Sequence, residues 1–366
     1  MKKVLHVNSS ISSNSGVMNV IMNYYRHIDR KKIQFDFLYY IEHENNYKKE
    51  LDKLGSYYYL ISSPKNILKF KDELSSFLVQ HFGEYEIVHL HDIFLARIMY
   101  KIFKDHGIKK VIVHCHSAKW SNNLLSGIRN KLMCINLNKY ADDFFACSRA
   151  AGNFVYKKDM EYTIVNNAIE IDRFVYSVQQ RKKLRAEMKL DNKIVIGHVG
   201  RFSKEKNHKF LIEVFEEILK INKNSVLLLI GEGDLKEKIE LNIKELDLEN
   251  KVILLGNRKD VNLLYQVMDV FILPSIYEGL PLVGVEAQIS GLRCVMSDVI
   301  TNEVNLTDVS FLSLKTTKKD WAVKILEKAN EGRIINSADM VKEKEFSICQ
   351  EAEKLQKLYL NMLYDK

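Results

Sequence analysis

The sequence predicts an α/β protein with two domains, each a parallel sheet covered by helices on both faces. Three observations support this fold class. The chain has 366 residues, more than one ordinary domain holds. Short apolar runs rich in β-branched residues alternate with longer amphipathic stretches. The alternation occurs twice, on either side of an irregular segment at residues 166–177, where we expect the domain boundary.

Each half of the chain contains its own series of expected strands and helices. In the first half, strands are expected at 4–7, 35–40, 87–90, 110–114 and 143–147, and helices at 17–25 and 67–81. In the second half, strands are expected at 194–199, 226–230, 252–255, 270–273 and 294–296, and helices at 209–221, 235–246, 282–289 and 347–363. Continuous apolar strands between helices indicate doubly wound parallel sheets. Ligands are then expected at the carboxyl ends of strands, in a cleft between the domains.

The composition is typical of a soluble globular protein, with 46% hydrophobic and 28% charged residues. No apolar run approaches the roughly 18 residues of a membrane span, and the run at 4–7 is too short for a signal peptide. The 5 cysteines are widely spaced and form no CxxC pair. We therefore expect a cytoplasmic protein with reduced thiols, without a disulfide framework or a cysteine metal site.

Positive charge is concentrated in the first half of the chain. Residues 1–170 contain 24 Lys and Arg against 17 Asp and Glu, whereas the second half is nearly balanced. Solvated lysine-rich helices would explain this excess, and so would contact with an anionic lipid surface or a phosphate-bearing partner. The sequence has no zinc-finger pattern, RNP-like segment or Arg-rich tract, so nucleic acid is not an expected partner.

Two loops that follow expected strands have the composition of phosphate-binding loops. Residues 9–17 are small and polar and include Gly16, just before a helix whose first N–H groups lack partners. Residues 199–210 contain Arg201 and Lys206, two cations that suit a diphosphate. Ordinary strand-to-helix loops also have such residues. Neither loop contains the GxGxxG motif of dinucleotide binding.

Histidines stand at the ends of two expected strands, in the segments VHLHD and VHCHSAK. Alternate residues of a strand share a face, so His89 is expected beside His91 and His114 beside His116. Such histidines hold metals, act in acid–base chemistry, bind sugar hydroxyls or serve only the fold. No further type of ligand is clustered nearby, so no metal is expected. His116, at the carboxyl end of its strand, is the preferred site residue.

The segment PSIYEGLPLVGVEAQISG at 274–291 places two carboxylates around the start of a helix. Pro281 suits an early helical position, and Gly291 suits the end of the helix. Glu278 is then expected in the preceding loop, and Glu286 about one turn inside the helix. Backbone N–H groups between them would hold a phosphate, and the carboxylates would accept bonds from sugar hydroxyls. A purely structural role as helix-dipole partners would suit Glu278 but not Glu286.

Together these segments resemble glycosyltransferase family 4, which consists of retaining enzymes with the GT-B fold. EGLPLVGVE matches the paired-glutamate motif of the family. GRFSKEKNHKFLI is similar to its G-R…E-K…L-I segment, and IVNNAIEIDRF to its P-N-G-I-D…F linker, with Asn166 and Ala168 at the Pro and Gly positions. The resemblance is strongest over residues 163–300. It points to the subgroup that builds capsule and exopolysaccharide repeat units.

The resemblance implies two Rossmann-like domains that face a cleft. Residues 1–170 would bind the acceptor, residues 171–346 would bind the nucleotide sugar, and a C-terminal helix within 347–366 would return to the first domain. The implied donor is a UDP-hexose or UDP-N-acetylhexosamine, with GDP-mannose as the second choice. The implied acceptor is a saccharide, lipid-linked at the inner face of the membrane. No metal or other cofactor is implied, in agreement with the lack of an Asp-x-Asp motif in a suitable loop.

The resemblance also assigns roles to the residues of the glutamate segment. Glu286 would bind the ribose hydroxyls of the nucleotide, and Glu278 would contact hydroxyls of the donor sugar. The backbone N–H groups of Leu282 and Val283 would hold the diphosphate. The other donor-binding residues would be Gly279 and Leu280, with Asn257 and Arg258 framing the base.

The remaining roles implied by the resemblance concern the phosphates and the reacting carbon. Arg201 and Lys206 would neutralise the departing diphosphate in place of Mg²⁺. Gly16 would line the phosphate side from the first domain. His116 would lie near the reacting carbon and the donor sugar.

Two alternatives to sugar transfer stay open. A UDP-sugar 2-epimerase of the GT-B fold would interconvert nucleotide sugars without an acceptor. A non-catalytic nucleotide-sugar-binding subunit would only bind them, although the set of Arg201, Lys206, Glu278 and Glu286 favours turnover. The acceptor is expected to be selected by variable loops of the first domain, notably residues 118–130.

Overall fold

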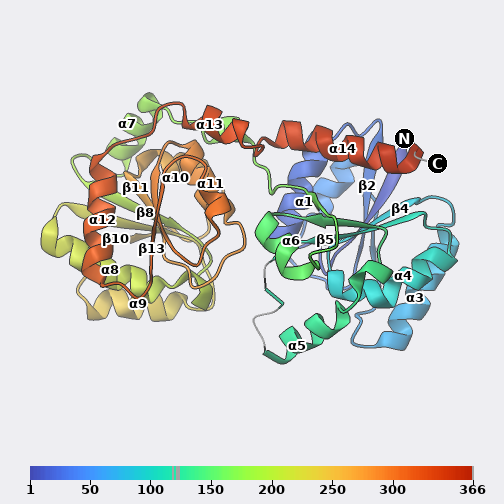
Figure 1. Cartoon of the computed structure of the whole chain (residues 1–366). Helices are drawn as coiled ribbons and strands as arrows, with labels where there is room; N and C mark the ends of the chain where they lie inside the picture. The colour runs from blue at the N-terminus through green and yellow to red at the C-terminus, as the bar shows by residue number, and fades with distance from the viewer. Residues whose placement is uncertain (118, 121–123, 365–366) are drawn as a thin grey trace. The chain divides into compact units, whose positions relative to one another are not determined.

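The computed structural model describes residues 1–117, 119–120 and 124–364. These residues form two compact units: unit 1 comprises Met1–Ala168 and the segment from Ile348 onward, and unit 2 comprises Ile169–Ser347 (Figure 1). The chain therefore leaves unit 1 two residues before the expected boundary at 170. Residue 118 and residues 121–123 of the expected acceptor loop, and residues 365–366 of the expected C-terminal segment, lie outside the described residues.

Unit 1 is a doubly wound α/β domain. Its described residues form a seven-stranded parallel sheet in the order β3-β2-β1-β4-β5-β6-β7. The strands are β1 (Lys2–Val7), β2 (Ile33–Tyr39), β3 (Tyr58–Leu60), β4 (Ile87–Leu90), β5 (Lys110–Cys115), β6 (Asp143–Ala146) and β7 (Thr163–Ile164). The helices are α1 (Gly16–His27), α2 (Lys48–Leu54), α3 (Ile67–Gln80), α4 (Ala96–Asp105), α5 (Leu124–Met133), α6 (Arg149–Val155) and the C-terminal α14 (Ile348–Tyr364).

Helix α14 belongs to unit 1 although it follows the whole of unit 2 in sequence. It packs against α1 (Figure 1). Its apolar face buries Ala352, Leu355 and Tyr359, and the side-chain carbonyl of Gln356 accepts the N–H of Asp29 at 2.8 Å. The expected return of the C-terminal helix to the first domain is confirmed.

Unit 2 is a second doubly wound domain. Its sheet has six parallel strands in the order β10-β9-β8-β11-β12-β13. The strands are β8 (Ile194–Val199), β9 (Ser225–Ile230), β10 (Val252–Leu254), β11 (Val270–Leu273), β12 (Arg293–Ser297) and β13 (Val309–Leu312). The helices are α7 (Val178–Glu187), α8 (His208–Ile221), α9 (Lys236–Glu245), α10 (Val261–Val267), α11 (Leu282–Ile289), α12 (Lys318–Asn330) and α13 (Ser337–Glu343).

Strand alternation gives unit 2 a hydrophobic core on each face of its sheet. In β9, Val226, Leu228 and Ile230 join one core, whereas Leu227 and Leu229 join the other. Both faces are apolar because helices cover both, which explains why the strand reads as one continuous apolar run. The central strands therefore carried the strongest sequence signal.

Two further expectations concern the membrane and the thiols. Within the described residues, no helix combines the length and apolar character of a membrane-spanning segment. Four of the described cysteines are buried and Cys349 is exposed, and all of them are free thiols.

Candidate functional site

The sheet of unit 2 changes its direction of growth between β8 and β11. The chain adds β9 and β10 on one side of β8 and then continues with β11, β12 and β13 on the other. Loops diverge at such a switch point and leave a crevice at the carboxyl ends of the strands. Arg201 and Lys206 follow β8, and Glu278 follows β11. The topology thus brings these three expected residues to one edge of the sheet.

Lys206 and Glu278 form an ion pair at this edge. Lys206 Nζ lies 2.5 Å from Glu278 Oε1, and the two side chains are only 16% and 15% exposed. The hydroxyl of Ser275 donates to the same carboxylate oxygen at 2.8 Å. The N–H of Ile276 donates to the carbonyl of Glu205 at 2.8 Å, which ties the two loops together. The pair is therefore a fixed, half-buried feature and not a chance contact of mobile surface chains.

Glycines allow the loop after β8 to lie directly on the loop after β9. A Cβ on Gly231, whose φ is +138°, would stand 2.1 Å from the carbonyl oxygen of Gly200. A Cβ on Gly233 would stand 2.5 Å from the carbonyl oxygen of Phe202. The N–H of Phe202 donates to the carbonyl of Glu232 at 2.9 Å. These contacts fix the backbone on both sides of Arg201.

Helix α11 begins at the same edge of unit 2. Pro281 is its N-cap and provides no side-chain cap, so it stands one position earlier than the early helical position expected for it. Leu282 and Val283 are the first two helical residues, and the first N–H groups of a helix have no intrahelical acceptor. Gly291 follows the helix with a φ of +74°, as expected for a helix-ending glycine. The helix thus presents unpaired donors and its positive dipole end.

Glu286 lies about one turn inside α11 and is held by α10. The hydroxyl of Tyr265 donates to Glu286 Oε2 at 2.9 Å. Burial raises the pKa of the Glu286 carboxyl, while the Tyr265 hydrogen bond and the positive charge of Arg173 act in the opposite direction. Tyr265 is the only hydrogen-bond donor to this carboxylate within the described part of the chain, which leaves acceptor positions for a ligand.

The other expected residues of unit 2 differ in their exposure. Arg201 is 70% exposed, with Nη2 3.6 Å from the carboxylate of Asp234. Arg258 is exposed and makes two bonds of 2.7 and 2.5 Å to the carboxylate of Asp260, and Asn257 is exposed beside it. Between Glu278 and the helix lie the half-buried Gly279 and the buried Leu280. The described residues show no contact between Arg201 and the Lys206–Glu278 pair.

Unit 1 has a switch point of its own between β1 and β4. The loop after β1 leads into α1, where Ser15 caps the helix by accepting the N–H of Met18 at 3.3 Å. Gly16 is the first helical residue, and a Cβ added to it would meet no atom within 4 Å. Packing inside unit 1 therefore does not require glycine at this position.

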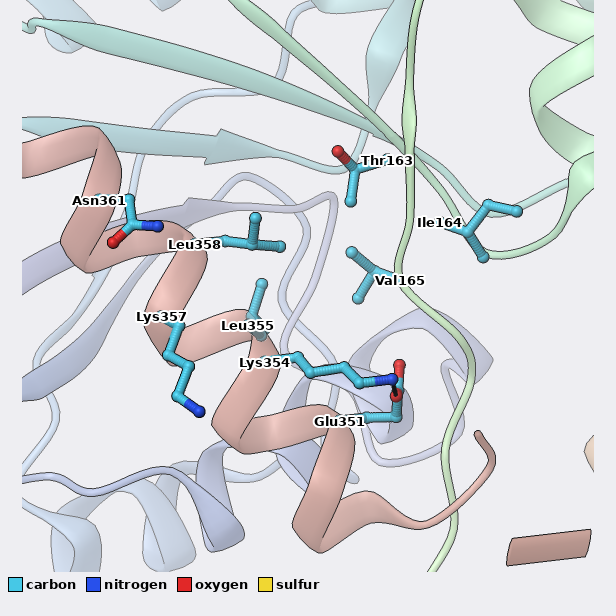
Figure 2. A pocket seen from close by; sticks show the side chains of 9 residues that line it. All are labelled: Thr163, Ile164, Val165, Glu351, Lys354, Leu355, Lys357, Leu358 and Asn361. Carbon is cyan, nitrogen blue, oxygen red and sulfur yellow. Dashed lines mark ion pairs between the residues drawn. The ribbon is translucent and has the colours of Figure 1, made fainter. Parts of the chain in front are cut away.

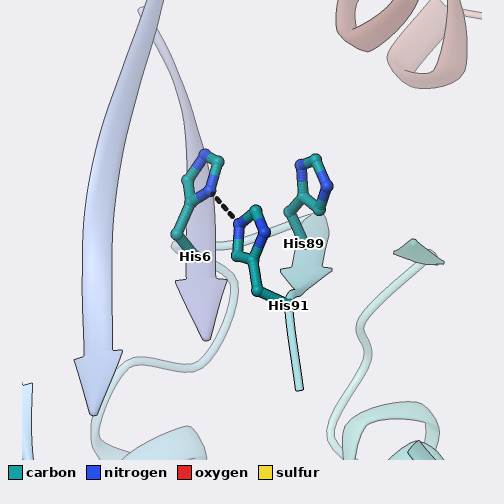
Figure 3. Close-up of side chains that lie close together, drawn as sticks. All are labelled: His6, His89 and His91. Atoms are coloured by element: carbon teal, nitrogen blue, oxygen red, sulfur yellow. Dashed lines mark hydrogen bonds between the residues drawn. The ribbon is translucent and has the colours of Figure 1, made fainter. Parts of the chain in front are cut away.

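Five histidines of unit 1 gather beside this switch point: His6 from β1, His89 and His91 from the end of β4, and His114 and His116 from the end of β5. Figure 3 shows His6, His89 and His91 with their rings facing one another. The ring centroids of His89 and His91 are 4.4 Å apart, and those of His114 and His116 are 4.0 Å apart. Both pairs expected from strand alternation are confirmed, and His6 adds a member that was not expected.

The hydrogen bonds of the histidine cluster run across the strands in two rows. In one row, His91 Nε2 lies 3.0 Å from His6 Nδ1, and His91 Nδ1 lies 2.8 Å from His116 Nε2. The other row joins Tyr359, His89 and His114, with distances of 2.5 Å from Tyr359 Oη to His89 Nδ1 and 3.1 Å from His89 Nε2 to His114 Nδ1. Burial lowers the pKa of His6 and His116 to about 3 and that of the other three well below its usual value. The cluster is therefore neutral at pH 7.

Unit 1 also has a cavity away from the histidine cluster, between β7 and α14 (Figure 2). It has a volume of about 330 Å³ and an apolar wall that includes Val165, Leu355 and Leu358. Lys354 Nζ pairs with Glu351 Oε1 at 2.9 Å on its border. None of the expected site residues lines this cavity.

Four residues contribute to these sites without having been expected. Ser275 donates a hydrogen bond to Glu278, and Tyr265 donates one to Glu286. Gly200 lies close to Lys206, because a Cβ on Gly200 would stand 3.1 Å from Lys206 Cδ. His6 joins the histidine cluster. Of these four residues, only Gly200 could have been predicted from the sequence, because it directly precedes Arg201 at the end of a strand. The others depend on contacts between distant segments.

Comparison with known proteins gives the family. Residues 179–345, within unit 2, match the model of the family "Glycosyl transferases group 1". EpsF of Bacillus subtilis (strain 168), a protein named as a glycosyltransferase, is 32% identical over 343 residues, which cover 91% of this chain and 89% of that protein. An Escherichia coli UDP-Gal:alpha-D-GlcNAc-diphosphoundecaprenol alpha-1,3-galactosyltransferase is 24% identical over 389 residues, covering 96% of this chain and 95% of that enzyme.

Solved structures agree on the fold. The crystal structure of Anabaena Alr3699/HepE in complex with UDP matches 99% of this chain and 100% of that chain, with a TM-score of 0.81 and 17% identity. At this identity the likeness shows architecture alone. The two Rossmann-like units and the returning α14 are those of the GT-B fold, as expected.

Proposed function

This chain belongs to the group 1 glycosyltransferases, and we propose that it moves a hexose or N-acetylhexosamine from a nucleotide sugar to a saccharide acceptor with retention of anomeric configuration. The observation that carries this proposal is the half-buried Lys206–Glu278 pair at the switch point of unit 2. It places an ammonium for phosphate and a carboxylate for sugar hydroxyls at the edge where α11 begins.

In this proposal, residues of unit 2 contact every part of the donor. The N–H groups of Leu282 and Val283 hold the diphosphate at the positive end of α11. Glu286, held by Tyr265 on one side, accepts bonds from the ribose hydroxyls. Glu278 accepts bonds from the donor sugar while it shares Lys206 with the phosphates. The exposed Asn257 and Arg258 remain the proposed contacts of the base.

The chemistry requires the bond between the anomeric carbon and the diphosphate oxygen to break as the oxygen of an acceptor hydroxyl bonds to that carbon, and the proton of this hydroxyl passes to the departing diphosphate oxygen. Negative charge then develops on the departing diphosphate. Lys206, the exposed Arg201 and the helix N-terminus stabilise this charge in place of a metal ion. Gly16 and His116 are the proposed contributions of unit 1, through close backbone approach to phosphate and through contact with the donor sugar.

UDP is the preferred nucleotide, and GDP the second choice. The E. coli relative is named for a UDP-galactose donor, and the Anabaena structure is named for bound UDP. The same E. coli enzyme is named for an acceptor on diphosphoundecaprenol. These names support a UDP-sugar donor and a lipid-linked saccharide acceptor in the assembly of capsular or exopolysaccharide.

A lipid-linked acceptor calls for contact with a membrane surface, and α5 has the features of such a contact. Apolar side chains spaced three, four and three residues apart share its solvent face. They are Leu125 (77% exposed), Ile128 (52%), Leu132 (55%) and, just after the helix, Ile135 (49%). We name these four residues the α5 stripe. Lys131, on α5 itself, and Lys139, four residues after Ile135, are exposed. An apolar stripe with flanking cations suits the interface of an anionic bilayer.

One panel of measurements tests the proposed reaction. Release of UDP or GDP is measured from several nucleotide sugars, with and without a saccharide linked to a lipid diphosphate. We expect release that depends on the acceptor. Epimerised donor without release would replace transfer by a UDP-sugar 2-epimerase activity. Tight binding of nucleotide sugar without any turnover would instead assign a non-catalytic binding subunit.

A further inference from the structure

The histidine cluster of unit 1 contains more nitrogen ligands than its hydrogen bonds use. A cavity of about 10 Å³ is lined by the five rings together with largely apolar side chains such as Val20, Phe35 and Leu355, and it has room for about one water-sized particle. Three buried ring nitrogens of this cluster have no hydrogen-bond partner in the described residues: His6 Nε2, His114 Nε2 and His116 Nδ1. Buried polar atoms without partners are uncommon and call for an explanation such as an ion.

We propose that His91, His114 and His116 bind one divalent transition-metal ion of the zinc type. Each of them offers one ring nitrogen, and the three nitrogens lie within 4.8 Å of one another. Imidazole nitrogens bind Zn²⁺ at about 2.0–2.1 Å and also suit Cu, Ni and Fe. The set comes from the ends of two adjacent strands, a rigid base for three ligands.

The hydrogen bonds of the cluster fit this ligand set. With His114 Nε2 on the ion, His114 Nδ1–H can still donate to His89 Nε2, 3.1 Å away. With His91 Nδ1 on the ion, His91 Nε2–H can still donate to His6 Nδ1, 3.0 Å away. Only the hydrogen bond between His91 Nδ1 and His116 Nε2 has to break. The ion then replaces the proton that lies between these two nitrogens. Two ligands thus keep the outer partners that metal-binding histidines usually have.

A second triad, His6, His89 and His91, also meets the distance condition. It fits the hydrogen bonds less well, because both ring nitrogens of His89 are engaged, with Tyr359 and with His114. The first triad instead uses His114 Nε2, which has no partner in the described chain.

The surroundings of the triad also favour binding. His116 is half-buried, and with His91 it lines a second cavity of about 170 Å³. That cavity provides an entry path and room for water as the fourth ligand of a tetrahedral site.

The test measures metal binding alone, so its outcome does not depend on the proposed sugar transfer. Untagged, full-length protein is stripped with a chelator, exchanged into chelator-free buffer, and titrated with Zn²⁺ by calorimetry and with Co²⁺ by visible absorption. We expect about one ion per chain and the intense Co²⁺ bands of a tetrahedral site. Thermal unfolding should shift upward with Zn²⁺.

Three variants make the assignment specific. His114→Asn should abolish high-affinity binding, whereas His6→Asn, which removes an outer partner, should weaken it only about 10- to 100-fold. His198→Asn, at an equally buried histidine of unit 2, should bind like the wild type. Circular dichroism checks that each variant is folded. Absence of binding by the wild type, unchanged binding by folded His114→Asn, or a larger loss in His6→Asn than in His114→Asn would each overturn the proposed site.

Discussion

At the scale of single residues, the Lys206–Glu278 pair joins two roles that the sequence treated separately. The ammonium pairs with a carboxylate, and in the proposed donor complex it would also contact a phosphate of the donor. Because both side chains are largely buried, removal of either one leaves a charge without its partner. If the proposed roles hold, the pair couples the sugar-binding part of the site to its phosphate-binding part.

Replacement of Lys206 by alanine tests this coupling. We expect Lys206→Ala to lower kcat by ~10²-fold or more, because its charge acts mainly on the departing diphosphate. Lys204→Ala removes an exposed lysine from the same turn and should leave kcat close to that of the wild type. A near-normal kcat for Lys206→Ala, in protein that unfolds at the same temperature, would remove Lys206 from the mechanism.

Glu286 allows a prediction about pH. Burial raises its pKa in the folded state above the ordinary value of 4.5, so the unfolded chain gives up this proton more readily. The carboxyl therefore contributes less to stability as the pH rises above 4.5. Glu286→Gln should be more thermostable than the wild type at pH 8, and this difference should shrink toward pH 5. Equal differences at both pH values would contradict the burial of this charge.

The same variant should lose nucleotide affinity while it gains stability. A hydrogen bond to a charged group is worth about 1.5–3 kcal/mol, so UDP should bind roughly 10- to 100-fold more weakly to Glu286→Gln. Calorimetric titration with UDP measures this. Unchanged affinity would exclude the ribose-binding role, and the stability measurement would still report on burial.

At the scale of elements, the strands that are buried on both faces were predictable, whereas β10 was the only one of the four edge strands in the described sheets that was expected. The expected strands at 194–199 and 270–273 agree with β8 and β11 to the residue. Strands β3, β7 and β13 were not expected, and each stands at or near an edge of its sheet with largely half-buried side chains. Such short segments become strands because they pair with an adjacent strand of the sheet. This pairing depends on the tertiary structure, so the local sequence does not predict it.

The same distinction applies to the sites. Glu278, Glu286 and their helix are close in sequence, and α11 has the bounds expected for it. Lys206 and Glu278 are 72 residues apart, and only the switch between β8 and β11 brings them together. His6 stands alone in an apolar strand, so no local pattern could have joined it to the other histidines.

Two glycines provide a matched comparison between a position that packing restricts and a position of the proposed site. Gly231→Ala should destabilise unit 2 by about 1–3 kcal/mol, because its Cβ would strike Gly200 and its φ of +138° disfavours alanine. Gly16→Ala should leave the thermal unfolding temperature nearly unchanged, since its Cβ meets open space. If backbone approach to phosphate needs Gly16, activity should nevertheless fall in the folded Gly16→Ala variant. Full activity there would exclude Gly16 from the site.

At the scale of the whole molecule, the excess positive charge of the first half and the α5 stripe belong to the same unit. We expect the protein to bind anionic vesicles more tightly than neutral ones at low salt, and this preference to fade as salt rises. Leu125→Ser/Leu132→Ser should weaken vesicle binding about tenfold or more through the loss of apolar contact. Leu241→Ser, an equally exposed leucine of unit 2, is the control. Equal binding to anionic and neutral vesicles would refute the membrane contact.

The proposal that unit 2 holds a nucleoside diphosphate between Lys206 and the start of α11 is tested most directly by calorimetric titration of the wild-type protein with UDP and with UMP, in the presence of EDTA. We expect UDP to bind at one site per chain without added metal. UMP should bind at least about tenfold more weakly, because it lacks the second phosphate that the ammonium and the helix N–H groups would hold. Equal affinities for UDP and UMP, or no UDP binding until a divalent metal is added, would contradict this proposal.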